Sequence, residues 1–547
     1  MTQKQTYLLA LLSAILLWLA WPPMPFTAAL LLIGLVPLFI ALQAIRTDGQ
    51  PNTSKRIFRT AGLTFLLWNT ASIYWVYNAI VAYNDPITAF LVSLIPFGLG
   101  ALLMTTAFWL YFRLSQVTSS KIAYLGLICF YIGMEYLHQS WDLAFPWMTL
   151  GNGFAGMHQL VQWYEYTGVY GGSLWILLSN ILAFEAYKAF RTYKGYPGYR
   201  LAVFWLILIM VPIAISLKRY FSYEEKSMPV NVVTVQPNID PYKKLGDLPV
   251  AAQMRILTHL SDSVAQPNTE YFLWPETAVA QYSEEETIRD SREYATMLEF
   301  ISKYKNGNLI TGIETLNKYN DKRTISAKKD YNSDIYYDNY NAAIQVENSS
   351  NVQFYHKSKL VPGVEQMPFP TALAFLAPIF SELGGSVGGY GWQEEPGVFY
   401  SQNGVGVDPV ICYESIWGDW VRRSVKNGAQ FIGVITNDAW WGNTSGKDQH
   451  LLYAKLRAIE NRRWVVRSAN TGISAFIDQR GDIIKRSEWW VATALKADIN
   501  LNSDITFYTK NGDIIAVLGS FIGIVMIFII PVQDYRRKRA LKAKQPR

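Results

Sequence analysis

Long uninterrupted runs of apolar residues are the feature that most constrains this chain. A run of about 20 apolar residues can cross a bilayer as a helix. The runs occupy most of the first 217 residues, and one more lies near the C-terminus. The sequence therefore predicts a membrane protein with eight spans: Tyr7–Trp21, Thr27–Ile45, Thr60–Val81, Ile87–Phe112, Ile122–Leu137, Gly171–Phe190, Leu201–Leu217 and Ile514–Val532.

Basic residues mark one side of the predicted membrane. They occur in the loops after spans two, four and six and in the C-terminal tail, whereas the loops after spans one, three and five carry no Lys or Arg. Because short cytoplasmic loops accumulate positive charge, both termini are expected in the cytoplasm and residues 218–510 on the opposite side. The net charge of +7 follows from this bias and needs no nucleic-acid partner.

The domain organisation follows from the same pattern. We expect seven transmembrane helices in 1–217, an α/β domain in 218–510, an eighth transmembrane helix in 511–533 and a basic cytoplasmic tail in 534–547. In the α/β domain, strands are expected at 230–236, 270–274, 308–313, 339–347, 352–356, 405–411 and 431–436, and helices at 250–265, 284–305, 416–427 and 448–462. Strands that alternate with helices in this way predict a layered sheet covered by helices.

Cysteine is rare in the chain. There are two, and Cys129 lies inside a predicted span, so Cys412 is the single thiol of the α/β domain. Cys412 follows an apolar strand-like run and precedes a helical pattern, where a helix dipole favours the thiolate. Cys412 is therefore a candidate nucleophile, although a buried structural cysteine is the commoner role of such a residue.

Two more reactive side chains stand at the ends of other predicted strands. Glu276 follows one strand in Trp274-Pro275-Glu276, and Lys357 follows another in Tyr355-His356-Lys357. In α/β proteins, binding and catalytic residues often lie at the ends of the strands. A thiol nucleophile needs a base and a group that stabilises the oxyanion, and Glu276 and Lys357 can supply these roles. The sequence has no metal-binding His/Cys spacing and no glycine-rich phosphate loop, so no cofactor and no metal are expected.

The motifs around these residues carry a family resemblance. They are Trp274–Thr277, Tyr355–Pro362, Ile411–Glu414, Thr436–Trp440, Arg457–Glu460 and Asn470–Gly472, together with Phe145–Trp147 in the loop after span five. The α/β domain resembles the nitrilase, or carbon–nitrogen hydrolase, superfamily. With the spans on both sides, the whole chain resembles the bacterial apolipoprotein N-acyltransferase family. The resemblance implies an extracytoplasmic αββα sandwich and a catalytic triad of Glu276, Lys357 and Cys412.

The resemblance also implies a reaction and its participants. An acyl chain would move from a phospholipid, by way of a thioester on Cys412, to the N-terminal α-amine of the diacylglyceryl cysteine of an apolipoprotein. Glu365 and Glu414 would orient the lysine and the nucleophile. The residues expected to contact substrate are Trp417, Trp440 and Trp441. The enzyme would be a monomer in the bacterial inner membrane, with its catalytic domain on the periplasmic side.

Alternatives remain open at this point. A membrane-anchored amidase could use the same triad with water and a small amide, and a receptor or transporter could carry an inactive hydrolase-like domain. Seven preceding spans exceed what an anchor needs, and few charged residues lie within the spans, which favours acyl transfer. The family's usual Phe-Gly before Glu365 is Gly363-Val364 here. The apolar segment 372–379 and the glycine-rich segment 384–391 suggest a mobile lid, or equally an ordinary surface loop.

Overall fold

The structure is a computed structural model that describes residues 1–547 except 83, 194–195, 242–243, 245–246, 374, 376–388 and 544–547. The chain divides into two compact units. The first consists of Met1–Tyr74, Ala89–Phe221 and Asp513–Arg547, and the second of Trp75–Thr88 and Ser222–Gly512. Most of the lid expected at 372–379 and 384–391 lies outside the described residues, so the lid stays a prediction.

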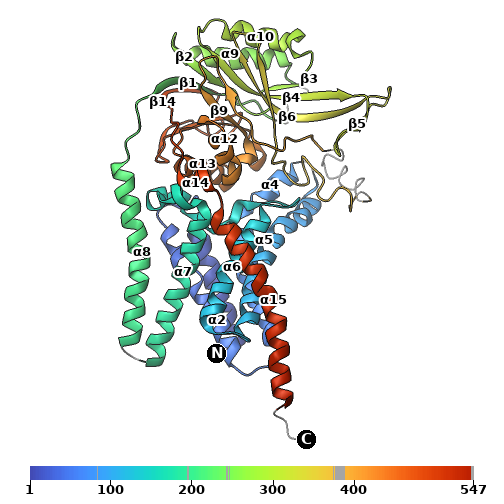
Figure 1. The fold of residues 1–547 in the computed structure, drawn as a ribbon. Coiled ribbons are helices and arrows are strands. Elements are labelled where there is room, and N and C mark those ends of the chain that lie inside the picture. Colours follow the sequence, from blue (N-terminus) through green and yellow to red (C-terminus); the bar gives the residue numbers. More distant parts are fainter. Residues whose placement is uncertain are drawn as a thin grey trace. The chain divides into compact units, whose positions relative to one another are not determined.

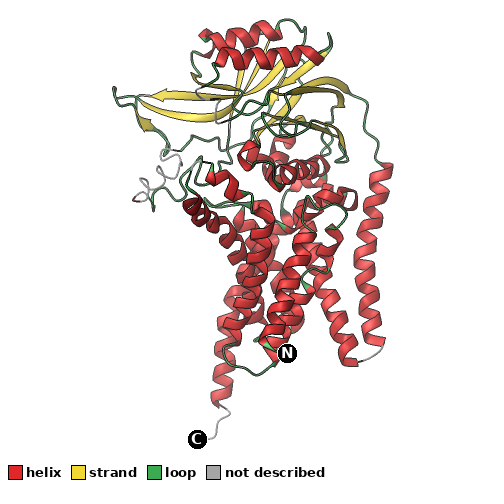
Figure 2. Cartoon of the chain, turned by 180° about the vertical axis from the view of Figure 1, so that it is seen from behind, coloured by secondary structure: helices red, strands yellow, loops and turns green. Residues whose placement is uncertain are grey.

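Helices and loops form the first unit, and no strand occurs among its described residues (Figure 2). Its long helices are α1 (Gln3–Leu19), α2 (Val36–Thr47), α3 (Thr53–Ile73), α5 (Pro86–Ser115), α6 (Ser120–His138), α7 (Tyr164–Tyr193), α8 (Tyr196–Ser222) and α15 (Ile514–Ala543). Within the described part of the chain, five stretches are long and apolar enough to cross a bilayer: Ala28–Thr47, Pro86–Ser115, Tyr164–Thr192, Pro197–Ser222 and Ile514–Arg537. The multi-span helical region is thus confirmed, whereas the number and direction of the crossings stay predictions.

Buried polar side chains of the first unit form hydrogen bonds with backbone groups that lie outside its long helices. Asn180 of α7 accepts a hydrogen bond from Leu35 N and donates one to Leu31 O, each at 2.7 Å. Glu135 of α6 accepts a hydrogen bond from Leu150 N at 2.7 Å. Lipid offers no hydrogen bonds to such backbone groups, so the side chains must supply them. Glu135 therefore has a structural role that gives no support to an ion path.

The third predicted span ends earlier than the sequence suggests. Helix α3 stops at Ile73, and a short helix, α4 (Val76–Val81), follows as part of the second unit. Trp75 Nε1 donates to Gln449 Oε1 at 3.1 Å, and the Trp75 ring lies 5.0 Å from that of Trp441. Because an unpaired indole N–H is costly in lipid, its hydrogen bond within the α/β unit stabilises the break.

Two sheets form the core of the second unit. The first has the order β14-β1-β2-β4-β6-β5, with β3 beside β4 and β7 beside β6, and the second has the order β13-β12-β11-β10-β9-β8. The strands of the first sheet are β1 (Pro229–Gln236), β2 (Thr269–Leu273), β3 (Val279–Glu284), β4 (Asn308–Tyr319), β5 (Lys328–Lys329), β6 (Tyr336–Glu347), β7 (Val352–His356) and β14 (Thr493–Asn500). Those of the second are β8 (Phe399–Tyr400), β9 (Gly406–Ile411), β10 (Ala429–Thr436), β11 (Val465–Ala469), β12 (Ala475–Ile477) and β13 (Ile483–Arg486).

Three apolar clusters give the second unit four layers. Helices α9 (Val250–Val264) and α10 (Arg292–Ile301) cover the outer face of the first sheet. A second cluster lies between the two sheets. Helices α12 (Gly418–Lys426) and α13 (Ser445–Asn461) cover the outer face of the second sheet (Figure 1), and a short helix, α14 (Phe507–Asn511), ends the unit. The αββα sandwich expected from the resemblance is confirmed.

The helix expected at 284–305 begins later in the structure. Residues Val279–Glu284 form strand β3, which pairs with β4, and α10 starts only at Arg292. Ser291 caps α10 by accepting a hydrogen bond from Tyr294 N at 3.1 Å. Helical spacing of buried apolar residues begins at Tyr294 and continues through Met297 and Ile301, which is why the helix starts there.

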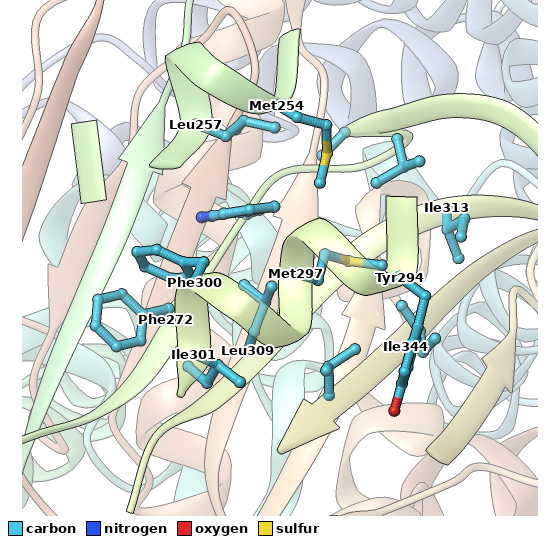
Figure 3. Packing of buried hydrophobic residues seen from close by; sticks show 14 of the residues in the cluster. Met254, Leu257, Phe272, Tyr294, Met297, Phe300, Ile301, Leu309, Ile313 and Ile344 are labelled. Carbon is cyan, nitrogen blue, oxygen red and sulfur yellow. The ribbon is translucent and has the colours of Figure 1, made fainter. Parts of the chain in front are cut away.

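Phe300 of α10 tests the packing of the outer layer. It is buried in the cluster of Figure 3, where its ring lies 5.0 Å from that of Phe272. Phe300→Ala is expected to lower the free energy of unfolding by about 3–5 kcal/mol, because it leaves a cavity. Thermal unfolding of the detergent-solubilised protein measures the loss. The control is Tyr331→Ala at a side chain that is 97% exposed, with an expected change within about 0.5 kcal/mol.

Candidate active site

Cys412 occupies a sharp turn at the end of strand β9. It opens a five-residue 3₁₀ turn, Cys412–Ile416, and its φ of 50° lies in the left-handed region, which is strained for a residue with a side chain. Ser415 Oγ donates to the Cys412 carbonyl oxygen at 2.8 Å. His450 Nε2 lies 3.2 Å from the same oxygen. These contacts hold the backbone in the strained turn and fix the direction of the thiol.

The resting Cys412 is a neutral thiol. Burial raises the pKa of the thiol, and the carboxylate of Glu276 raises it further. The ammonium of Lys357 and the hydroxyl of Thr436 lower this pKa by less. The expectation that a helix dipole favours the thiolate is therefore wrong, because the 3₁₀ turn is one short turn whose dipole cannot offset desolvation. A thiol with a raised pKa would need a base in order to act as a nucleophile.

Glu276 lies in the turn that follows strand β2. Thr277, the next residue, has a φ of 47°, so this turn is also strained. Gly312 of β4 allows the turn to approach, since a Cβ at Gly312 would lie 2.5 Å from Thr277 N. Lys244 Nζ donates to Thr277 Oγ1 at 3.1 Å and to the Glu276 carbonyl at 3.4 Å. The β2 strand end is thus fixed by contacts on both sides.

Lys357 brings an ammonium to Glu276 from the end of strand β7. Its Nζ donates to Glu276 Oε1 at 3.0 Å and to Glu365 Oε1 at 2.8 Å. Burial alone would lower the pKa of Lys357, but the two carboxylates raise it well above its usual value. Lys357 also interacts electrostatically with Cys412. Glu276, Lys357 and Cys412, which the sequence predicts to act together, therefore belong to one buried cluster.

Asn341 is a member of this cluster that the sequence analysis missed. Its Nδ2 donates to Glu276 Oε1 at 2.8 Å and to Glu365 Oε1 at 3.2 Å, and its carbonyl oxygen accepts a hydrogen bond from Lys357 N at 2.9 Å. Glu365 is held in turn by Val361 N, which donates to its Oε2 at 2.8 Å. The sequence signal that could have identified Asn341 was its place in the predicted strand 339–347, as a polar residue at a position that faces the core.

Glu414 joins the Lys357 loop to the Cys412 turn. Its Oε1 accepts hydrogen bonds from Ser358 N at 2.6 Å and from Tyr355 Oη at 2.8 Å, and its Oε2 accepts one from Ile411 N at 2.9 Å. Burial raises the pKa of Glu414, while these donors oppose the shift. One carboxylate thus connects the residues next to the ammonium with the residue next to the thiol.

A second buried charge network contacts the Cys412 turn through His450. His450 Nδ1 lies 3.0 Å from Asp438 Oδ1, and Arg467 donates to Asp438 Oδ2 at 2.5 Å. Burial would raise the pKa of Asp438, but Arg467 and His450 lower it to about 2. Burial and Arg467 lower the pKa of His450. The sequence analysis did not connect His450 to the cysteine, which lies 38 residues away in the chain.

The three predicted substrate-contacting tryptophans differ in their surroundings. Trp417 is buried, and its ring lies 4.7 Å from that of Tyr413. Trp441 is half-buried, with its ring 5.0 Å from Trp75 and 5.2 Å from His450. Trp440 is also half-buried. Trp417 and Trp441 therefore pack around the neighbours of Cys412, and substrate contact by all three stays a prediction.

Comparison with known proteins covers nearly the whole chain. Residues 13–182 match the family model of the apolipoprotein N-acyltransferase N-terminal domain, and residues 233–505 match that of the carbon-nitrogen hydrolases. The apolipoprotein N-acyltransferase of Chlorobaculum tepidum is 30% identical over 526 residues, which cover 94% of this chain and 94% of that protein. Its counterpart in Geobacter metallireducens is 27% identical over 518 residues, covering 94% and 93%.

Among solved structures, XC1258 from Xanthomonas campestris, a CN-hydrolase superfamily protein, aligns with 50% of this chain and 91% of its own, at 15% identity and a TM-score of 0.35. The two family models match in the order in which the helical region and the sandwich occur in the chain. From these matches and the 30% identity along nearly its whole length, the chain belongs to the apolipoprotein N-acyltransferase family.

Proposed function

We propose that this protein transfers an acyl chain from a phospholipid to the N-terminal α-amine of the diacylglyceryl cysteine of apolipoproteins. The observation that carries the proposal is the buried cluster of a thiol, a carboxylate and an ammonium, in a chain of this family. In this cluster Cys412 is the nucleophile, Glu276 the base and Lys357 the cation. Membership of the family supplies the class of acceptor, and the cluster supplies the chemistry.

The first half-reaction forms a thioester. Glu276 takes the thiol proton as Cys412 Sγ attacks the ester carbonyl carbon of the phospholipid. A C–S bond forms, the ester C–O bond breaks, and the leaving lysophospholipid oxygen receives the proton from Glu276. The raised pKa of the thiol supports this order of events, because proton removal and attack must then occur together.

Lys357 is suited to stabilise the tetrahedral oxyanion. An ammonium has three N–H donors, and among the described residues two of them are used on Glu276 and Glu365. The third N–H remains for the negative oxygen that develops during attack. A preorganised donor of this kind lowers a barrier by roughly 3–4 kcal/mol. Glu365 and Asn341 hold the ammonium in place while this charge develops.

In the second half-reaction the acceptor amine attacks the thioester. The C–N bond forms, the C–S bond breaks, and Glu276 passes a proton from the attacking amine to the departing sulfur. All the proposed groups come from the second unit of one chain, so a monomer suffices. The pattern of basic loops supports a location in the bacterial inner membrane, with this unit at the periplasmic face and both termini in the cytoplasm.

Incubation with phospholipid alone should add one acyl group to the enzyme. Intact mass spectrometry is expected to show this gain in the unmodified protein and its reversal by hydroxylamine, because thioesters react with that nucleophile. Cys412→Ala should remove the gain entirely. Cys129→Ala is the matched control, since Cys129 is the other cysteine and should leave acylation unchanged. Acylation that persists in Cys412→Ala would refute the thioester. Free fatty acid with an unmodified acceptor peptide would favour the amidase alternative.

Glu276→Gln should slow thioester formation by about 10²–10⁴-fold, the usual contribution of a general base. The substitution keeps the shape of the side chain but removes its ability to take the thiol proton. Rapid-quench sampling followed by mass spectrometry measures the rate. Glu299→Gln on the exposed face of α10 serves as the control and should retain the original rate. An unchanged rate in Glu276→Gln would assign the base to another residue.

The rate of alkylation distinguishes the proposed role of Glu276 as a base from its effect on the pKa of the Cys412 thiol. Because the Glu276 carboxylate raises the pKa of Cys412, Glu276→Gln should increase the thiolate fraction at a given pH. Reaction of Cys412 with iodoacetamide should therefore become faster in Glu276→Gln, although acyl transfer becomes slower. Lys357→Met should have the opposite effect on alkylation, since Lys357 lowers this pKa. Mass spectrometry of the Cys412 peptide between pH 7 and pH 10 measures the alkylation rate in each variant, and slower alkylation together with slower acylation in Glu276→Gln would contradict the assignment.

A further inference from the structure

A second carboxylate lies on the inner face of the first sheet, beyond Asn341. Glu314 of β4 pairs directly with Asn341 of β6 in the antiparallel register. Ile310 and Ala343 lie an even number of positions away on the same two strands, and both belong to the apolar core between the sheets. Because side chains alternate along a strand, Glu314 and Asn341 point to this same inner side, at the polar end that holds Glu276.

The Asn341 side chain has an acceptor that its known contacts do not use. Its NH₂ group donates to Glu276 and Glu365, as described above. Its Oδ1 is buried and has no hydrogen-bond partner among the described residues, and the whole residue is only 5% exposed. A buried acceptor without a donor is costly and points to a ligand that brings an N–H or O–H group.

Charges around this position do not balance. The electrostatically connected groups in the described residues include the carboxylates of Glu276, Glu314, Glu365 and Glu414 and the ammoniums of Lys244 and Lys357. Because the Cys412 thiol is neutral at rest, and a thioester is neutral too, carboxylates outnumber ammoniums in this set. A primary ammonium would offset part of this excess negative charge and would also supply N–H donors.

We propose that Glu314 and the Asn341 Oδ1 oxygen bind the α-ammonium of the lipoprotein acceptor, and that Glu314 takes the proton which the amine must lose before it attacks. The inference rests on the acyl transfer proposed above and concerns only its second half-reaction. Glu314 is thereby a catalytic residue distinct from Glu276, because it touches the acceptor amine and not the thiol.

The proton balance of the second half-reaction contains a step that such a group can perform. The acceptor arrives as an ammonium, since an α-amine has a pKa of about 8. One proton passes to Glu314, the free amine attacks the thioester, and the second proton passes through Glu276 to the departing sulfur. The proton on Glu314 then returns to solvent. Overall, one ammonium and one thioester give one amide, one thiol and one released proton.

The surroundings of Glu314 fit this role. Burial raises the pKa of Glu314, which makes it a stronger base than an exposed carboxylate. Tyr390 Oη donates to Glu314 Oε1 at 3.1 Å and lies 3.4 Å from Tyr282 Oη. Tyr282 is 44% exposed, so this chain of hydroxyls leads from Glu314 to the surface. A released proton has a route to solvent that avoids the triad.

The two half-reactions can be measured apart in the full-length protein. The enzyme is first acylated with phosphatidylethanolamine in detergent micelles and then chased with a synthetic diacylglyceryl-cysteinyl peptide, while intact mass reports the acyl-enzyme. Glu314→Gln should form the thioester at the original rate and lose it to the peptide at least about 10-fold more slowly at pH 7. The defect should shrink at about pH 9.5, where the peptide amine is already deprotonated.

Comparison with the unmodified protein at each pH removes the contribution of the other titratable groups that face Glu314, namely Lys244, Glu276, Tyr282 and Tyr390. Tyr390→Phe, which removes a hydrogen bond to Glu314 and keeps the ring, should slow the same step by a smaller factor. Glu284→Gln in the neighbouring strand is the matched control and should change neither step, since Glu284 pairs with Lys318 at the surface.

Three outcomes would overturn the inference: a chase as fast in Glu314→Gln as in the unmodified protein, a slowing that is equal at both pH values, or a loss of thioester formation in Glu314→Gln. Absence of any thioester in the unmodified protein would instead refute the proposed function itself. The two failures are therefore distinguishable within one experiment.

Discussion

A buried ammonium shared by two carboxylates is the interaction on which the rest of the site depends. Lys357 lies between Glu276 and Glu365, and Asn341 binds both carboxylates from the next strand. A charge at this depth is stable only when its partners and their hydrogen bonds are complete. The strained turn at Glu276 and the close approach of Gly312 serve this requirement, because they bring the carboxylate to the ammonium.

The same requirement explains why the thiol is kept neutral. A thiolate beside Glu276 would add negative charge to a desolvated cluster, and one lysine does not compensate for it. The cluster thus holds a carboxylate and an ammonium as a buried ion pair beside a neutral thiol. Glu414 fixes the Lys357 loop relative to the Cys412 turn, because it accepts hydrogen bonds from the backbone next to each of these two residues.

Local patterns in the sequence were sufficient for the layered fold and for the three strand ends that carry Glu276, Lys357 and Cys412. Each of these signals is a short run of neighbouring residues. The sequence did not reveal Asn341 and His450, because their contacts depend on the packing of strands and helices that are distant in the chain. The protonation of Cys412 escaped for a different reason: desolvation depends on what surrounds the thiol in three dimensions, and no local motif encodes it. The break after α3 was missed because Trp75 and its neighbours are apolar enough to continue a span.

The break after α3 makes the catalytic unit discontinuous in sequence. Its residues 75–88 follow helix α3 and include the first turn of helix α5, yet they belong to the compact unit that carries the thiol. A soluble protein cut at residue 222 would lack a piece of its own surface: the Trp75 indole, which covers Gly446 and packs against Trp441, would be missing. Since Trp441 contacts His450, which contacts the Cys412 carbonyl, removal of residues 75–88 would weaken the support of the Cys412 turn. Separation of the α/β unit from the helical region at residue 222 would therefore expose the surface that Trp75 covers.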